Sequence, residues 1–199
     1  MTRLAGVTDF DAPTRAYLES VLHGNFDEIP NSLSTLALQP AILKAAVGLW
    51  QAVMSGGEVP RPLKWMVGNL ASKAHGCMYC SAHTVTGAGR SGVAPEKLAA
   101  LWSFESSPLF DDRERTALRF AFLAAQVPNG LDDAHFDAMK QYFSDAAIAE
   151  ILAVVAVYGF YNRWNDSLAT PLETHPRETA LAHLSAHGWT PGAHAPRPD

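Results

Sequence analysis

The chain has 199 residues, of which 48% are hydrophobic and 18% are charged, and its formal net charge is −5. This composition excludes an intrinsically disordered chain, and an acidic balance without a basic run argues against a nucleic-acid-binding surface. The start of the sequence has no apolar run of the kind that a secretory signal needs, so we expect a cytoplasmic protein.

Apolar residues recur at helical spacing along most of the chain, and no stretch alternates as a half-buried strand does. Residues 1–30 predict an N-terminal extension with one short helix and a loop. Helices are then expected, in chain order, over residues 40–54, 61–75, 77–90, 95–104, 111–127, 132–143, 144–165 and 177–187. The sequence therefore predicts an all-α fold, a single-domain helical bundle over residues 31–188, with a flexible tail over residues 189–199.

The most apolar stretch, residues 146–161, carries Glu150 and is too short to cross a bilayer. It predicts a buried core helix and no membrane partner. The helix ends in the polar run Asn162-Arg163-Trp164-Asn165, which we interpret as a helix end with its cap and interface hydrogen bonds.

Both cysteines of the chain, Cys77 and Cys80, lie at the start of one predicted helix. Gly76 before them is suited to end the preceding helix in the left-handed conformation. Positions i and i+3 of an α-helix have Cα atoms ~5 Å apart, inside the range that a disulfide tolerates. His83 follows Cys80 at the same interval, which places it beside Cys80 but ~10 Å from Cys77. A dithiol with a base beside only one sulfur indicates a redox site.

The two cysteines are expected to play different parts. A helix start stabilises thiolate, the nucleophilic form of cysteine, and His83 can accept the proton of Cys80 and later return it. Cys80 is therefore predicted to attack a peroxide O–O bond and become a sulfenic acid. Cys77 then condenses with the sulfenic acid to give a disulfide, and we expect an external dithiol to reach Cys77, which lies nearer the helix start.

These residues allow three other interpretations. A thioredoxin-like redox motif follows a β-strand, whereas the segment before these cysteines is helical. A structural zinc site could use His75, Cys77, Cys80 and His83, although such sites usually draw their ligands from two separate segments. Two buried, inert cysteines on a packing face are the remaining alternative.

The segment Cys77-Met-Tyr-Cys80-Ser-Ala-His83-Thr84 resembles the alkylhydroperoxidase D / carboxymuconolactone decarboxylase superfamily, in particular the peroxidase-related branch with the motif C-x-Y-C-x-A-H-T. The resemblance continues in residues 110–120, with the pattern Phe-x-x-x-Glu-Arg-x-Ala-Leu-x-Phe, and in residues 151–168. It covers roughly residues 25–170.

The resemblance implies an all-α fold assembled as a homo-oligomer, either a dimer or a hexamer. It also implies that Cys80 attacks the hydroperoxide, that Cys77 resolves the product, and that His83 belongs to a proton relay with a glutamate. The electron donor implied is a dithiol reductant protein, either dihydrolipoyl-bearing or thioredoxin-like. Decarboxylase members lack the cysteine pair, so its presence here favours the redox members of the superfamily.

Two departures from the family pattern concern the proton relay. Two residues separate Cys80 from His83, where the best-known pattern has three, and Trp65 stands where the relay glutamate is expected. Glu114 and Glu150 are the candidate carboxylates for the place of this glutamate in the relay. The sequence thus predicts a thiol-dependent peroxidase without a bound cofactor. The alternatives are a helical binding or redox-sensing protein without turnover and a decarboxylase-like acid–base enzyme.

Overall fold

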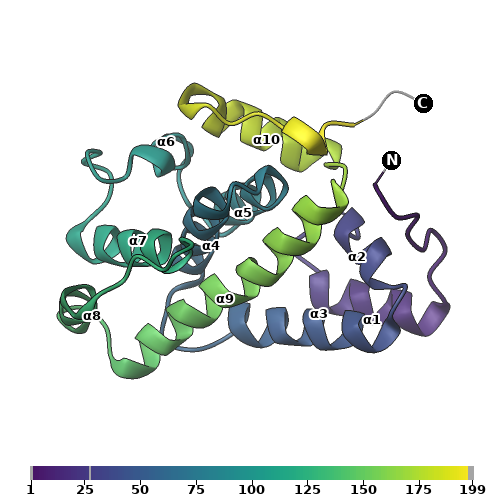
Figure 1. Ribbon diagram of the computed structural model, residues 1–199, viewed down its shortest axis with the longest axis horizontal. Helices are drawn as coiled ribbons and strands as arrows, with labels where there is room; N and C mark the ends of the chain where they lie inside the picture. Colours follow the sequence, from purple (N-terminus) through teal and green to yellow (C-terminus); the bar gives the residue numbers. More distant parts are fainter. Residues whose placement is uncertain (1, 27, 197–199) are drawn as a thin grey trace.

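The computed structural model describes residues 2–26 and 28–196, and these residues form helices and connecting loops without a β-strand. The all-α prediction is therefore confirmed (Figure 1). The α-helices are α1 (Ala12–Leu22), α2 (Asn31–Leu36), α3 (Pro40–Met54), α4 (Arg61–His75), α5 (Met78–Arg90), α6 (Pro95–Ala99), α7 (Asp112–Ala124), α8 (Asp133–Lys140), α9 (Asp145–Leu168) and α10 (Thr174–Leu184).

Helices α4 and α5 form the centre of the bundle. Helix α4 packs against α5, α7 and α9, whereas α10 covers another side of α5 (Figure 1). Gly76, at φ +76°, ends α4 in the left-handed conformation as predicted. The Trp65 ring lies so close to Gly87 that a Cβ added there would be 2.5 Å from it, so glycine allows α4 and α5 to approach. This approach fixes the helix that carries both cysteines.

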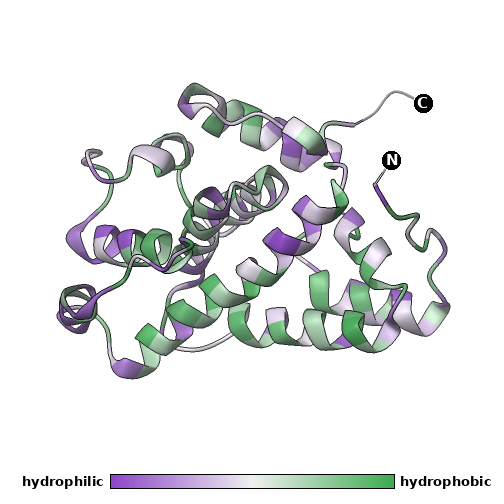
Figure 2. Cartoon of the chain, viewed as in Figure 1, coloured by the Kyte–Doolittle hydropathy of each residue, from purple (hydrophilic) through white to green (hydrophobic). Residues whose placement is uncertain are grey.

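Helix α9 crosses the molecule and is longer than the sequence suggested. It spans 24 residues and is long and apolar enough to cross a membrane by length and composition alone. Half of its most apolar window is buried inside the protein, which is also the pattern of a core helix. Figure 2 shows that its first half is apolar, whereas its last turns are polar. The stretch 146–161 alone is too short to cross a bilayer, but the helix that contains it, predicted over residues 144–165, runs from Asp145 to Leu168.

The C-terminal segment also differs from its prediction. A flexible tail was expected from residue 189, but Trp189 is 1% exposed and His194 is 3% exposed. Residues Gly192–His194 form a 3₁₀-helix, and the carbonyl of His194 accepts a hydrogen bond from the Leu172 N–H at 2.9 Å. The segment is packed because these two side chains contact the bundle, while residues 197–199 lie outside the described part of the chain.

Several helix boundaries moved as well. The helix expected over residues 95–104 is divided into α6 and the 3₁₀-helix Leu101–Ser103, and the last helix begins at Thr174 rather than at residue 177. The N-terminal residues join the main core, since Leu18 of α1 is fully buried and Phe26 packs against Trp50 at a ring-centroid distance of 5.6 Å.

Candidate active site

The first cysteine is the N-cap of the helix that carries the second. Cys77 adopts an extended conformation, and its Sγ accepts a hydrogen bond from the backbone N–H of Cys80 at 3.5 Å. The Ser81 hydroxyl donates to the carbonyl of Cys77 at 2.8 Å and fastens the same turn. Both cysteines are free thiols, so the structure describes the reduced state.

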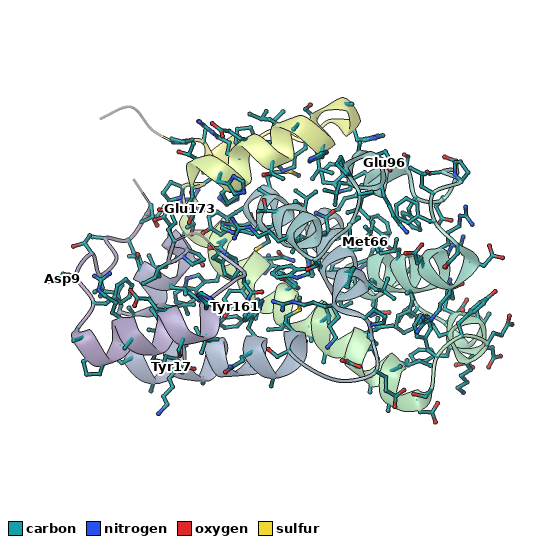
Figure 3. All side chains as sticks on the ribbon, turned by 180° about the vertical axis from the view of Figure 1, so that it is seen from behind. Asp9, Tyr17, Met66, Glu96, Tyr161 and Glu173 are labelled. Atoms are coloured by element: carbon teal, nitrogen blue, oxygen red, sulfur yellow. The ribbon has the colours of Figure 1, made fainter. Side chains whose placement is uncertain are left out.

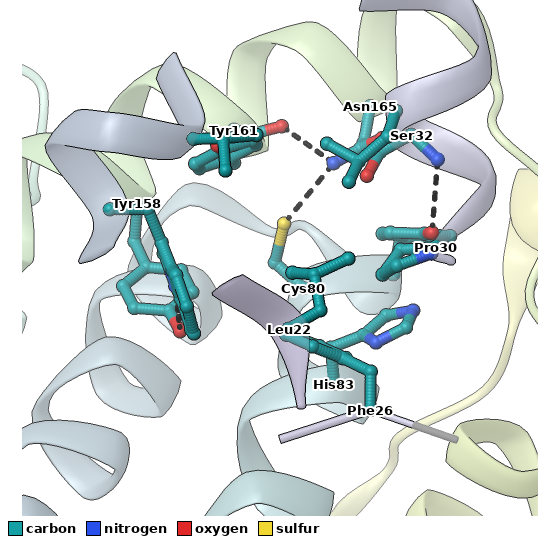
Figure 4. Close-up of a pocket in the computed structure, with 13 residues that line it drawn as sticks. Leu22, Phe26, Pro30, Ser32, Cys80, His83, Tyr158, Tyr161 and Asn165 are labelled. Atoms are coloured by element: carbon teal, nitrogen blue, oxygen red, sulfur yellow. Dashed lines mark hydrogen bonds between the residues drawn. The ribbon is translucent and has the colours of Figure 1, made fainter. Parts of the chain in front are cut away.

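Cys80 lies on the wall of a pocket with about 500 Å³ of empty space, the open solvent at its mouth included. Its Sγ accepts a hydrogen bond from Asn165 Nδ2 at 3.5 Å, and the same amide donates to the carbonyl of Tyr161 at 2.9 Å (Figure 4). A carbonyl can only accept, which identifies this Asn165 atom as the amide nitrogen. An N–H donated to sulfur stabilises negative charge that develops there.

The rest of the pocket is mainly apolar and aromatic. Phe26, Val47, Trp50, Tyr158 and Tyr161 line it together with His83. Burial raises the pKa of both tyrosines well above its usual range, so their hydroxyls stay protonated. A pocket lined mainly by apolar and aromatic side chains suits a small, largely apolar molecule.

His83 has a carboxylate partner, and this partner is Glu173. His83 Nε2 lies 2.8 Å from Glu173 Oε2, while Glu173 Oε1 accepts from the Tyr79 hydroxyl at 2.8 Å and from the Asn31 N–H at 2.5 Å. Burial opposes the charge of Glu173, but His83 and the backbone N–H of Asn31 outweigh it and lower the pKa of the carboxyl. Figure 3 shows Glu173 between α10 and the N-terminal helices. The site therefore contains a buried His–carboxylate pair.

The two carboxylates proposed from the sequence serve elsewhere. Glu114 belongs to the capping box of α7 and binds Lys97 at 2.6 Å, and Glu150 pairs with the buried Lys64. Trp65 fills the place expected for the relay glutamate, where its indole packs on Gly87.

Glu173 was missed because it is 90 residues away from His83 along the chain. It stands at the N-cap position of α10, just beyond the left-handed Ala169 that ends α9. The only local signal is an acidic residue before a predicted helix, and such residues are common as caps.

Cys77 differs from the prediction in two respects. It is 0% exposed and does not line the pocket, whereas Cys80 is 3% exposed and does. Burial, with the neighbouring Cys80, raises the pKa of the Cys77 thiol well above its usual range, where a lowered value was expected. The expectation that an external dithiol reaches Cys77 more readily does not fit this arrangement, because the C-terminal segment packs beside it.

The four zinc ligands considered from the sequence are engaged separately. His75 Nδ1 is 2.9 Å from the amide nitrogen of Asn162 at the end of α4, and His83 binds Glu173. Asn162 is thus a partner of His75, and Arg163 is exposed. The residue of this polar run that lines the pocket is Asn165, which the sequence had not singled out for that role.

The model of the carboxymuconolactone decarboxylase family matches residues 40–122. The crystal structure of the debrominase Bmp8 is 35% identical in sequence, covers 88% of this chain and 96% of its own, and superposes with a TM-score of 0.81. The chain belongs to the carboxymuconolactone decarboxylase / alkylhydroperoxidase D superfamily. A cysteine-to-alanine variant of Bmp8, in complex with 2,3,4-tribromopyrrole, is 34% identical with the same TM-score, over 90% of this chain and 96% of that one.

Two further proteins resemble this chain, one in fold and one in sequence. A peroxidase-related protein from Ralstonia eutropha, described as an alkylhydroperoxidase AhpD core, is 20% identical over 98% of each chain, with a TM-score of 0.78. The uncharacterized protein YnjA of Escherichia coli (strain K12) is 29% identical over 97 residues, which are 49% of this chain and 53% of YnjA. The matched region thus spans about half the length of this curated relative. The superfamily includes enzymes, among them the debrominase.

Proposed function

We propose that this chain is a two-cysteine reductase that acts on a small, largely apolar molecule. The observation that carries the proposal is the position of Cys80, whose sulfur lies on the wall of the aromatic pocket and receives the Asn165 amide. The His83–Glu173 pair reaches the same wall, and Cys77 is one helical turn away. A nucleophile, a base and a second thiol are therefore within one site.

With an organic hydroperoxide as substrate, the reaction runs in two steps. The Cys80 thiolate attacks the outer peroxide oxygen, the O–O bond breaks, and protonated His83 gives its proton to the departing alkoxide. Cys80 is then a sulfenic acid. Cys77 attacks its sulfur, an S–S bond forms, and the hydroxyl leaves as water. The apolar lining favours an organic hydroperoxide over hydrogen peroxide.

A brominated aromatic ring is the second candidate substrate. It is favoured by the aromatic pocket walls and by the similarity to Bmp8 over 96% of that chain. His83 passes the proton that it took from Cys80 to the ring carbon, the Cys80 thiolate takes the bromine as a sulfenyl bromide, and the ring keeps hydrogen in its place. Cys77 then displaces bromide and forms the same disulfide, so one cysteine pair serves both reactions.

The pocket also offers a polar contact for a ligand. Asn165 Oδ1 is buried and has no hydrogen-bond partner among the residues that the structure describes. An unsatisfied buried acceptor costs about 1–3 kcal/mol, which a bound N–H or O–H would recover. A hydroperoxide and a pyrrole both have such a donor.

Turnover needs an electron donor, and the proposal includes a dithiol reductant protein, either dihydrolipoyl-bearing or thioredoxin-like. It also includes a homo-oligomer, a dimer or a hexamer. An interface on α3 is supported by two exposed apolar side chains of this helix, Ile42 and Leu49.

The test mixes reduced protein with cumene hydroperoxide or with 2,3,4-tribromopyrrole, without added reductant. We expect one equivalent of one probe to be consumed, with a Cys77–Cys80 disulfide as the protein product. Cys80→Ser abolishes the reaction, whereas Cys77→Ser still consumes one equivalent and stops without the disulfide. Consumption of neither probe contradicts the proposal. Turnover of a carboxymuconolactone by Cys80→Ser at the wild-type rate would instead identify an acid–base enzyme.

A further inference from the structure

A second buried histidine, His194, lies on the far side of the cysteine pair and belongs to the C-terminal segment. Its Nδ1 is 2.7 Å from the carbonyl oxygen of Thr170, and its Nε2 is 2.9 Å from Asp166 Oδ1. The residue is 3% exposed, so water does not replace these partners. Both ring nitrogens are therefore committed to neighbours from the end of α9 and the loop after it.

Both partners of His194 are acceptors. A backbone carbonyl has no proton to donate, and an ionised carboxylate has none either. Each ring nitrogen must then carry a hydrogen, which makes the ring an imidazolium. Burial opposes this charge, but Asp166, Cys77 and the Thr170 carbonyl outweigh it and raise the pKa of His194 to about 9.

This cation lies beside the resolving cysteine. The donor atoms of Cys77, Asp166 and His194 lie within 4.8 Å of one another. The Tyr79 ring packs on the imidazole at a centroid distance of 5.8 Å and completes the surroundings. A metal ion would need a lone pair on the imidazole, and with both nitrogens donating none is left. The cluster fits an ion pair placed against a thiol.

We propose that His194 is a positioning residue that stabilises the thiolate of Cys77, so that the C-terminal segment forms part of the redox centre. This inference rests on the proposed two-cysteine function. Buried thiolate in an apolar site is costly, and an adjacent fixed cation is the usual way in which proteins make it accessible. Burial raises the pKa of Cys77, and the neighbouring His194 acts in the opposite direction.

The stabilised thiolate acts in the second half of the reaction. Cys77 Sγ attacks the sulfenic sulfur of Cys80, the new S–S bond forms, and the S–O bond breaks. The proton that Cys77 loses on ionising passes to the departing hydroxide, which leaves as water. When an external dithiol later attacks Cys80, the S–S bond breaks and Cys77 leaves as the thiolate that His194 stabilises.

The segment that carries His194 is fastened at Trp189 and at His194 itself. The Trp189 indole donates to the carbonyl of Met78 at 3.2 Å, and the Leu172 N–H donates to the carbonyl of His194. These contacts place the imidazole against the first turn of α5. The position of the cation therefore depends on packing rather than on a flexible terminus.

The first measurement is the rate at which dithiothreitol reduces the Cys77–Cys80 disulfide. Because Cys77 leaves as the thiolate that His194 stabilises, we expect His194→Gln to slow this reduction about tenfold. His194→Lys keeps a cation and should recover most of the wild-type rate. His187→Gln is the matched control, since His187 is exposed and binds the Ala99 carbonyl. An unchanged rate in His194→Gln would overturn the inference.

The second measurement uses the wild-type protein and does not depend on how the variants fold. Nitrogen-15 NMR of labelled histidine should find both nitrogens of His194 protonated at neutral pH, and a singly protonated ring would overturn the inference. Neither measurement requires a substrate. Wild-type protein that consumes neither probe, but has the expected His194 signals, would refute the proposed function and not the effect of His194 on the thiol.

Discussion

A histidine paired with a carboxylate lies on each side of the two cysteines, and the two histidines differ in their hydrogen bonds. On the pocket side His83 binds Glu173 at 2.8 Å, and on the C-terminal side His194 binds Asp166 at 2.9 Å. In the described part of the chain His83 uses one ring nitrogen for its partner, whereas His194 uses both on acceptors. A histidine with a nitrogen left over can exchange a proton, but one with both nitrogens committed is a fixed charge. The hydrogen-bond partners of the two histidines, rather than their residue type, therefore give them different roles.

Removal of the Glu173 charge should have the largest effect and should act on the pocket side alone. Glu173→Gln leaves His83 without an anionic partner, and we expect oxidation of Cys80 to slow about 100-fold. Stopped-flow measurement of probe consumption checks this. The control is Glu178→Gln, which changes an exposed residue on the same helix. A loss shared by both variants would point to α10 as a whole.

The next effect concerns the packing that holds the cysteine helix. Gly87→Ala puts a methyl group 2.5 Å from the Trp65 ring, and we expect about 2 kcal/mol of lost stability in urea unfolding. Gly48→Ala is the comparison, because its nearest neighbour is 3.8 Å away and alanine favours a helix by about 0.5–1 kcal/mol. Equal effects of the two substitutions would contradict this account of the α4–α5 contact.

The contribution of His194 to the free energy of unfolding should depend on pH. The folded-state pKa of His194, about 9, lies above its ordinary value of 6.5. Its ion pair with Asp166 therefore contributes fully below pH 6.5, and the contribution disappears as the pH rises through about 9. We expect wild type to exceed His194→Gln by about 2 kcal/mol in free energy of unfolding at the lower pH, after allowance for the partial exposure of Asp166.

Unfolding measured below pH 6.5 and above pH 9 tests this difference. Cys77, Asp166 and Tyr79 also face His194, and because they are present in both proteins their own titration largely cancels. A stability gap that grows with pH would contradict the assignment of His194 as the cation.

The smallest effect concerns the turn at Ala169, which lies between the carboxylates Asp166 and Glu173 in the chain. Ala169 has φ +50°, a left-handed conformation that costs a residue with a Cβ about 1 kcal/mol. Ala169→Gly should therefore stabilise the protein by about 0.5 kcal/mol after the entropy of glycine is counted. Ala41→Gly, at an exposed position within α3, should have the opposite sign in the same thermal unfolding experiment.

Much of the helical layout could be read from the sequence, because it depends on neighbours in the chain. Apolar spacing and Gly76 predicted where α4 ends, and the helix expected from residue 111 begins as α7 behind its N-cap Asp111. The first turn of α5 was predicted in the same way, and with it the proximity of Cys77 and Cys80. Where the neighbours are distant the predictions failed, as for the tail that Trp189 anchors to the bundle.

By itself the sequence determined the all-α fold, the superfamily and the two cysteines on one helical turn, since each follows from residues a few positions apart. Only the tertiary structure decided which acid serves which histidine. Glu173 and Asp166 reach their partners across 90 and 28 positions. Such contacts are fixed by how α9 ends and how the following segment packs on α5. The charge of a buried group depends on these contacts through burial and hydrogen bonding, and residue spacing does not encode them.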